Sequence, residues 1–224
     1  MEAKTNPISS IPKETISWLL SSQTPSIRYL TRTQIIASPP SDPKAKAVRE
    51  IIPDTKPVTA ILSRQDVEGF WSNKKHYYSP KYRSSHWTMF LLTELAVPPD
   101  HPSMQLGADF MLKRMSEEVP YYHQEDATGF CCFWGNWLRY ELYCGKMKNP
   151  RVQEVIDFVC RDIHRLGKCK YNNDLPCAWA VARSLFGLAL IPPEDRSPAV
   201  RSAIQRGTAY LVEENICWPP TMPT

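Results

Sequence analysis

The chain has 224 residues, which is enough to bury a sizeable core in one or two domains. It holds only 8 glycines but 21 prolines, a combination that favours rigid helices joined at proline corners over a glycine-rich sandwich or a phosphate-binding α/β fold. The formal net charge of +4 is small and dispersed, so it gives no reason to expect nucleic acid as a partner.

The first 65 residues are predicted to contain a tail and a cap. Residues 1–13 lack the apolar core and cleavage site of a signal peptide, and we expect them to be disordered. Residues 14–224 are expected to form one domain, in which 14–65 is an irregular helical cap. Within this cap Ile27, Leu30 and Ile35 are predicted to face inward, and Pro43 is predicted to begin a helix.

The location of the protein is inferred from its apolar runs and its cysteines. No apolar run approaches the roughly 20 residues that cross a bilayer, so no membrane span is expected. The 7 cysteines are an odd number, which fits a disulfide framework poorly. We therefore expect a cytoplasmic protein with reduced thiols.

The segment after the cap is predicted to form a corner. It contains Gln65, Gly69 and Trp71, with three residues between the Gln and the Gly and one residue between the Gly and the Trp. The next segment carries the densest basic patch of the chain, which consists of Lys74, Lys75, Lys81 and Arg83 among tyrosines. This patch could touch phosphates, but we interpret it as a solvated loop rather than a nucleic-acid site.

From residue 84 onward the chain repeats. Pro102, Pro150 and Pro198 are spaced 48 residues apart, and each is predicted to begin a helix. Behind each proline, small or apolar residues recur at spacings of i, i+3, i+4, i+7 and i+11, which is one stripe of an α-helix. Each of these helices is preceded by a second, aromatic-rich helix, predicted over 84–96, 133–143 and 177–190. The stripes are Met104, Gly107, Ala108, Met111 and Met115; Val152, Val155, Ile156, Val159 and Ile163; and Val200, Ala203, Ile204, Gly207 and Leu211.

The Gln65–Trp71 pattern resembles the glutamine–tryptophan motif of terpenoid cyclases, in which the Gln caps a helix and stacks on the Trp. With the segments 78–87 and 169–179 and the sequence Arg196-Ser197-Pro198, most of the chain resembles bacterial prenyltransferase or squalene-oxidase repeat proteins. This resemblance implies an all-α fold, either an α/α toroid or an open arc of helix hairpins. A full toroid has six hairpins, and this chain has room for about five, so an incomplete toroid is expected.

The resemblance does not extend to catalytic residues. The Asp-x-Asp-Asp acid of cyclases and the Asp-Asp-x-x-Asp motif for metal-bound diphosphate are both absent. Protein prenyltransferases of this fold hold zinc with Asp, Cys and a later His, but no histidine follows Asp174 and Cys177. Whether the protein is an enzyme therefore stays open.

The aromatic helices suggest a ligand-binding concavity. Large rings bury hydrocarbon and stabilise cationic carbon, whereas the plainer interpretation is that they fill core space. Tyrosine pairs in two corresponding loops could rim such a concavity. The candidate ligand-binding residues are Trp87, Trp134, Trp137, Trp179, Tyr78, Tyr122 and His86.

Cysteines at the corners of successive repeats suggest a second site. Cys132, Cys169 and Cys177, with Cys131 as an alternative to Cys132, are expected to meet at one rim, where His123 or Asp174 could complete a tetrahedral zinc site. Buried structural thiols are the alternative, as is a nucleophile activated at the helix start near Cys132 or Cys177.

Three functions follow from these patterns. The first is a protein, catalytic or not, that binds an apolar ligand, such as an isoprenoid, in the aromatic concavity. The second is a helical-repeat scaffold that binds another protein. The third is a zinc-dependent transferase built on the cysteine rim.

Overall fold

The computed structural model describes residues 11–115, 131–169, 171 and 173–213. Within these ranges every regular element is a helix, which confirms the predicted all-α class. No helix there is both long enough and apolar enough to span a membrane. The α-helices are α1 (Lys13–Leu20), α2 (Pro25–Leu30), α3 (Pro43–Glu50), α4 (Lys56–Leu62), α5 (Ser85–Glu94), α6 (Pro102–Met115), α7 (Cys131–Tyr143), α8 (Pro150–His164), α9 (Ala178–Leu188) and α10 (Pro198–Glu213).

The repeat prolines begin helices as predicted, since α6, α8 and α10 start at Pro102, Pro150 and Pro198. Polar side chains satisfy the first free amides of two of these helices. Asn149 accepts a hydrogen bond from the amide of Arg151 at 2.9 Å, and Ser197 accepts one from Val200 at 3.2 Å. The helix starts are therefore encoded locally by a capping residue followed by proline.

The repeated stripes face the core. All five positions in α6 and all five in α8 are buried, and α10 buries Val200, Ala203 and Gly207. Ile204 and Leu211 are partly exposed in α10. Burial of these apolar stripes supplies the main driving force for packing the helices together.

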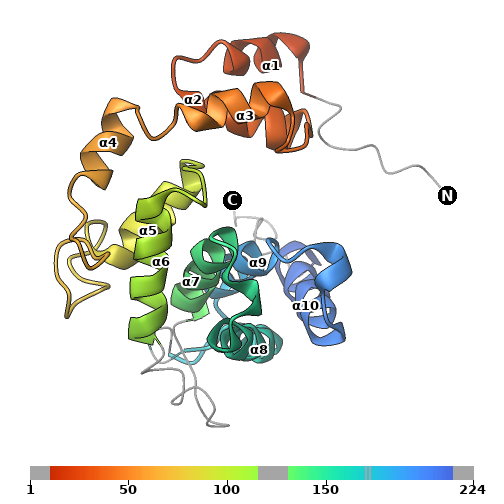
Figure 1. The fold of residues 1–224 in the computed structure, drawn as a ribbon. Helices are drawn as coiled ribbons and strands as arrows, with labels where there is room; N and C mark the ends of the chain where they lie inside the picture. The colour runs from red at the N-terminus through yellow and green to blue at the C-terminus, as the bar shows by residue number, and fades with distance from the viewer. Residues whose placement is uncertain (1–10, 116–130, 170, 172, 214–224) are drawn as a thin grey trace, which may run out of the picture.

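The helices of the repeat form two layers (Figure 1). The aromatic-rich helices α5, α7 and α9 contact one another in that order, with the most extensive packing between α7 and α9. The plainer helices α8 and α10 pack side by side, and α10 also covers α9. Each aromatic helix thus pairs with the helix that follows it, as a hairpin.

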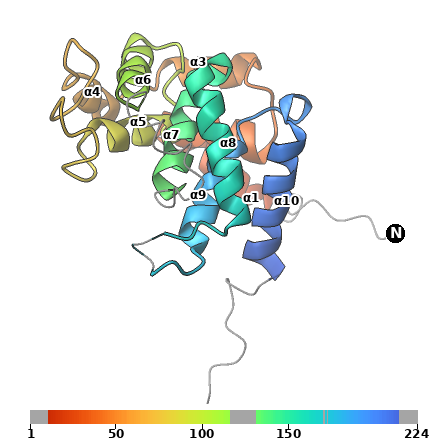
Figure 2. The same cartoon turned by 90° about the horizontal axis from the view of Figure 1, so that it is seen from below.

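Helices α1, α2 and α3 pack together as a cap, and α4 connects them along the chain to the repeat helices (Figure 1). In the view from below, the cap lies behind α8 and α10 (Figure 2). Arg49 of α3 donates a 2.6 Å hydrogen bond to the hydroxyl of Tyr143 in α7, and that hydroxyl donates to the carbonyl of Val97 at 2.7 Å. Pro43 begins α3 as predicted, with Asp42 as its cap. The prediction for Ile27 is wrong, because its side chain is exposed on the short helix α2.

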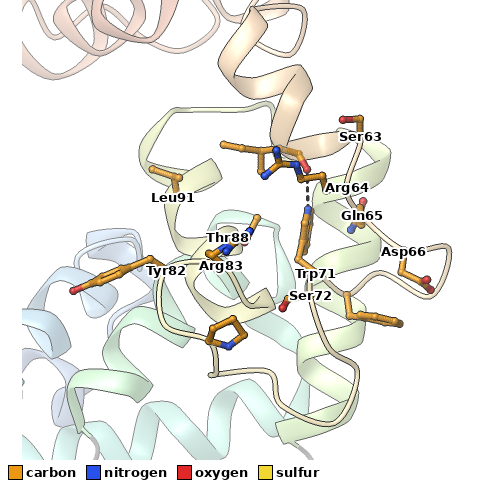
Figure 3. Close-up of a pocket in the computed structure, with 13 residues that line it drawn as sticks. Ser63, Arg64, Gln65, Asp66, Trp71, Ser72, Tyr82, Arg83, Thr88 and Leu91 are labelled. Carbon is orange, nitrogen blue, oxygen red and sulfur yellow. Dashed lines mark hydrogen bonds between the residues drawn. The ribbon is translucent and has the colours of Figure 1, made fainter.

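The corner after α4 differs from the expected motif geometry (Figure 3). Helix α4 ends at Leu62, whose carbonyl accepts a 3.0 Å bond from the backbone amide of Gln65, and the indole of Trp71 donates to the carbonyl of Ile61 at 3.0 Å. The Gln65 side chain does not bond to α4 itself. Gln65 instead donates to the carbonyls of Gly69 and Ser103, at 3.1 and 2.9 Å. Gln65 thereby ties the corner to the first turn of α6.

Candidate functional site

A pocket of about 590 Å³ lies where α5, α7 and α9 meet the loop that precedes α5. Aromatic rings from all four segments form most of its walls. A cavity of this size is typical of small-molecule sites, which are mostly apolar with a few polar groups. Its lining consists of Tyr78, Lys81, Tyr82, His86, Trp87, Phe90, Leu91, Glu94, Cys132, Phe133, Asn136, Trp179 and Arg183.

The rings on the α5 side form one connected cluster. The ring centroids of Tyr78 and Tyr82 each lie 5.2 Å from Trp87, and His86 stacks on Phe133 of α7 at 4.3 Å. The indole of Trp87 donates to the carbonyl of Tyr78 at 3.1 Å, which fixes the loop against the helix. These contacts preorganise an apolar wall before any ligand enters.

Two residues of this wall, His86 and Asn136, each have one side-chain polar atom without a hydrogen-bond partner among the described residues. His86 is fully buried, and burial lowers the pKa of its imidazole to about 3, so the ring is neutral at physiological pH. Its Nδ1 lies 3.2 Å from the hydroxyl of Tyr140, whereas its Nε2 has no hydrogen-bond partner among the described residues. The Oδ1 of Asn136 is equally unsatisfied in that part of the chain. Buried polar atoms without partners are costly, and sites that await a ligand are one place where they occur.

The pocket's charged groups sit beside its rings. The guanidinium of Arg183 lies 4.2 Å from the ring centroid of Trp179, and the ammonium of Lys81 lies 5.6 Å from that of Trp87. The one acid of the lining, Glu94, is neutralised by Arg139 at 3.0 Å. The pocket therefore has two rings that contact cationic side chains, Trp87 and Trp179. It also has two neutral polar side chains in its wall, His86 and Asn136.

The structure brings four of the predicted ligand-binding residues to this one pocket, namely Tyr78, His86, Trp87 and Trp179. Trp134 and Trp137 lie elsewhere, fully buried in the core between the two layers. Their burial gives them the packing role that was the alternative for aromatic side chains, and neither lines the pocket. Tyr122 lies outside the described residues.

The cysteine cluster is only partly as expected. Burial raises the pKa of the Cys132 thiol, and the nearby thiols of Cys177 and Cys169 raise it further. Cys132 therefore stays protonated at neutral pH. This differs from the activated thiolate that its position at the start of a helix had suggested. Among the residues that the structure describes, no group of three or more His, Cys, Asp or Glu side chains could hold a metal ion. His123 lies outside the described residues, so the expected zinc set that includes it stays a prediction.

Sequence reasoning missed two kinds of residue. Phe90, Phe133, Asn136 and Arg183 line the pocket, but only their places on aromatic helices hinted at this. Glu141 was not anticipated either: it is fully buried in α7, and burial raises its pKa well above the ordinary value of a carboxyl group. No motif marks these side chains, because their roles depend on which face of each helix turns to its neighbours.

No protein-family model matches the chain, and no curated protein or solved structure is significantly similar to it. The assignment of a site therefore depends on the geometry of the described residues.

Proposed function

We propose that the protein binds an apolar small molecule with one hydroxyl group, such as an isoprenoid alcohol, in the pocket between α5, α7 and α9. The observation that carries this proposal is the combination of a ring-lined wall with two unsatisfied polar atoms, on His86 and Asn136. The rings would bury the hydrocarbon. A closed or open toroid of hairpins is the arrangement that we propose for the whole chain.

The two polar atoms favour an alcohol over a hydrocarbon or an acid. The Oδ1 of Asn136 can only accept a hydrogen bond, so it requires a donor on the ligand. The Nε2 of the neutral imidazole of His86 can donate or accept, depending on the tautomer. A hydroxyl group can both donate and accept, and it therefore suits either of these atoms.

Titration with farnesol, followed by tryptophan fluorescence and by calorimetry, tests the proposal. Farnesol should quench the fluorescence through Trp87 and Trp179, and the saturated hydrocarbon farnesane should bind at least tenfold more weakly because it leaves the polar pair unsatisfied. Trp179→Leu should weaken farnesol binding. The matched control is Trp18→Leu, which removes another exposed indole, from α1, that is not part of the pocket lining. Equal losses in both variants, or no binding by the wild-type protein, would reject the proposal.

A second candidate is a scaffold that binds another protein through its cap. Trp18, Ile27, Ile36 and Ile51 are exposed apolar side chains on or beside α1, α2 and α3. Apolar side chains on a helical surface are typical of protein interfaces. This candidate would be favoured if farnesol and its relatives fail to bind while Trp18→Leu abolishes association with a partner protein.

A further inference from the structure

A second pocket, of about 650 Å³, lies at the corner between α4 and α5 and is separate from the aromatic pocket apart from two shared lining residues, Tyr82 and Leu91. Its walls come from the end of α4, the corner that follows, the loop before α5 and α5 itself (Figure 3). Its lining consists of Ile61, Ser63, Arg64, Gln65, Asp66, Phe70, Trp71, Ser72, Pro80, Tyr82, Arg83, Thr88 and Leu91.

Two arginines determine the charge of this pocket. Arg64 reaches it from the end of α4 and Arg83 from the loop before α5, so that two segments place guanidinium groups around one hollow (Figure 3). Among the described residues neither guanidinium group has an ion-pair or hydrogen-bond partner. The lining contains one acid, Asp66, and its Oδ1 accepts a 2.9 Å bond from the amide of Glu68 within its own turn. The pocket therefore keeps a net positive charge.

The backbone around the pocket is held in an unusual conformation. Ser72 and Tyr82 have φ angles of 69° and 67°, in the left-handed region that residues other than glycine rarely adopt. Both residues line the pocket. Such conformations persist where the surrounding structure imposes them, and they are concentrated at ligand sites.

We propose that this pocket binds a small molecule carrying a phosphate monoester, with Arg64 and Arg83 holding the phosphate. Two guanidinium groups from different segments approach an anion from two directions, and each can donate a pair of parallel hydrogen bonds. A phosphate monoester has three terminal oxygens and close to two negative charges, which matches this set better than the two coplanar oxygens of a carboxylate. The hydroxyl groups of Ser72 and Thr88 also line the pocket and add donors.

The rest of the pocket indicates a ligand larger than inorganic phosphate. The volume exceeds that of a single ion, and Phe70, Trp71, Tyr82 and Leu91 provide apolar surface beside the arginines. These side chains suit an organic body, and phenyl phosphate is therefore a suitable first probe. The hollow is formed by four consecutive segments of one chain, from the end of α4 to α5, which favours a small molecule over the extended backbone of a nucleic acid.

Calorimetric titration with phenyl phosphate, inorganic phosphate and benzoate tests the proposal. Phenyl phosphate should bind most tightly, and Arg64→Gln and Arg83→Gln should each weaken its binding at least tenfold. The matched control is Arg201→Gln, which removes an exposed arginine from α10 and should leave the dissociation constant unchanged. Circular dichroism confirms that each variant is folded. Farnesol binding should be the same in the double variant Arg64→Gln/Arg83→Gln as in wild type, so failure at either pocket is recognised separately.

Three outcomes would overturn the proposal. The first is a dissociation constant that is unchanged in the double variant, or equally weakened by Arg201→Gln. The second is binding of benzoate as tight as that of phenyl phosphate, which would show that charge alone is recognised. The third is displacement of phenyl phosphate by a single-stranded oligonucleotide whose own binding is lost in Lys74→Gln/Lys75→Gln, which would assign the arginines to a nucleic-acid surface.

Discussion

At the scale of single residues, Gly69 is the position of the corner that least tolerates substitution. Its φ of +95° lies outside the conformations that other residues favour, and an added Cβ would stand 2.4 Å from the carbonyl oxygen of Leu106. Backbone atoms of a buried helix cannot move aside as a flexible side chain can. The corner therefore needs glycine both for its conformation and for the close approach of α6.

Gly69→Ala should consequently lower the free energy of unfolding by more than about 2 kcal/mol. Gly145→Ala is the matched control, because Gly145 has a φ of +77° but no atom within 4 Å of an added Cβ. That variant carries only the conformational cost, about 1 kcal/mol. Urea denaturation of both variants measures the difference, and equal losses would show that the contact with α6 is not what limits this position.

The buried imidazole of His86, in the wall of the aromatic pocket, makes the stability of the protein depend on pH. Its folded-state pKa of about 3 lies below the value of about 6.5 expected in the unfolded chain. Between these two values the unfolded state binds more protons than the folded state. The stability that the neutral imidazole contributes is therefore fully present above about pH 6.5, and it is lost as the pH falls toward 3.

We expect the stability advantage of wild type over His86→Phe to fall by about 2 kcal/mol between pH 7.5 and pH 5. Urea denaturation at the two pH values measures this change. His76→Phe removes an exposed imidazole and serves as the control, since it should leave the pH dependence as in wild type. A pH-independent difference between wild type and His86→Phe would show that His86 is not buried as described.

At the scale of elements, the contact between α7 and α9 depends on two facing glycines. An added Cβ at Gly135 would lie 2.4 Å from the carbonyl oxygen of Arg183, and one at Gly187 would lie 2.5 Å from the carbonyl oxygen of Gly135. The two backbones therefore touch, and this close approach brings Asn136 of α7 and Arg183 of α9 to the same pocket.

Either Gly135→Ala or Gly187→Ala should separate the two helices and destabilise the protein by about 1 to 3 kcal/mol. Gly207→Ala in α10 is the control, because its Cβ would meet only side-chain atoms of Leu185 and Ile163. The gain in helix propensity should keep that variant within about 1 kcal/mol of wild type. Thermal denaturation of the three variants tests the prediction, which fails if Gly207→Ala is the most damaging change.

At the scale of the whole molecule, the cap of α1, α2 and α3 is held to the layers through the hydroxyl of Tyr143. Burial raises the pKa of this phenol to about 12, so it is neutral and can donate to Val97 while it accepts from Arg49. The guanidinium of Arg49 also lies 5.0 Å from the ring centroid of Tyr29 in the cap. One buried hydroxyl thus joins three segments that are distant in the sequence.

Tyr143→Phe should loosen the cap without unfolding the layers, because the ring keeps its packing and only the two hydrogen bonds are lost. Proteinase K should then cleave the connection between α3 and α4 several times faster than in wild type, while the fragment with α5 to α10 persists. Lys46→Ala, at an exposed site on α3, is the control. Equal cleavage rates would show that Tyr143 does not hold the cap in place.

Sequence alone determined the helices and the faces that they bury. Capping residue, proline and apolar stripe act within one or two turns, so Pro150 and the stripe from Val152 to Ile163 could be placed without knowledge of any neighbour. The sequence also indicated that aromatic residues gather in one layer. These features are local, and periodicity therefore predicts them.

Only the tertiary structure decided which aromatic side chains meet at the pocket. Trp134 and Trp179 belong to the same layer, yet one is fully buried and the other is 60% exposed, because the rotation of each helix is set by its contacts with the next. These contacts bring His86 and Asn136 to one pocket, and the corner after α4 brings Arg64 and Arg83 to another, although neither pair shares a motif. Close packing of the helix backbones at Gly135 and Gly187 fixes how α7 lies against α9, and no residue spacing within a single helix predicts that contact.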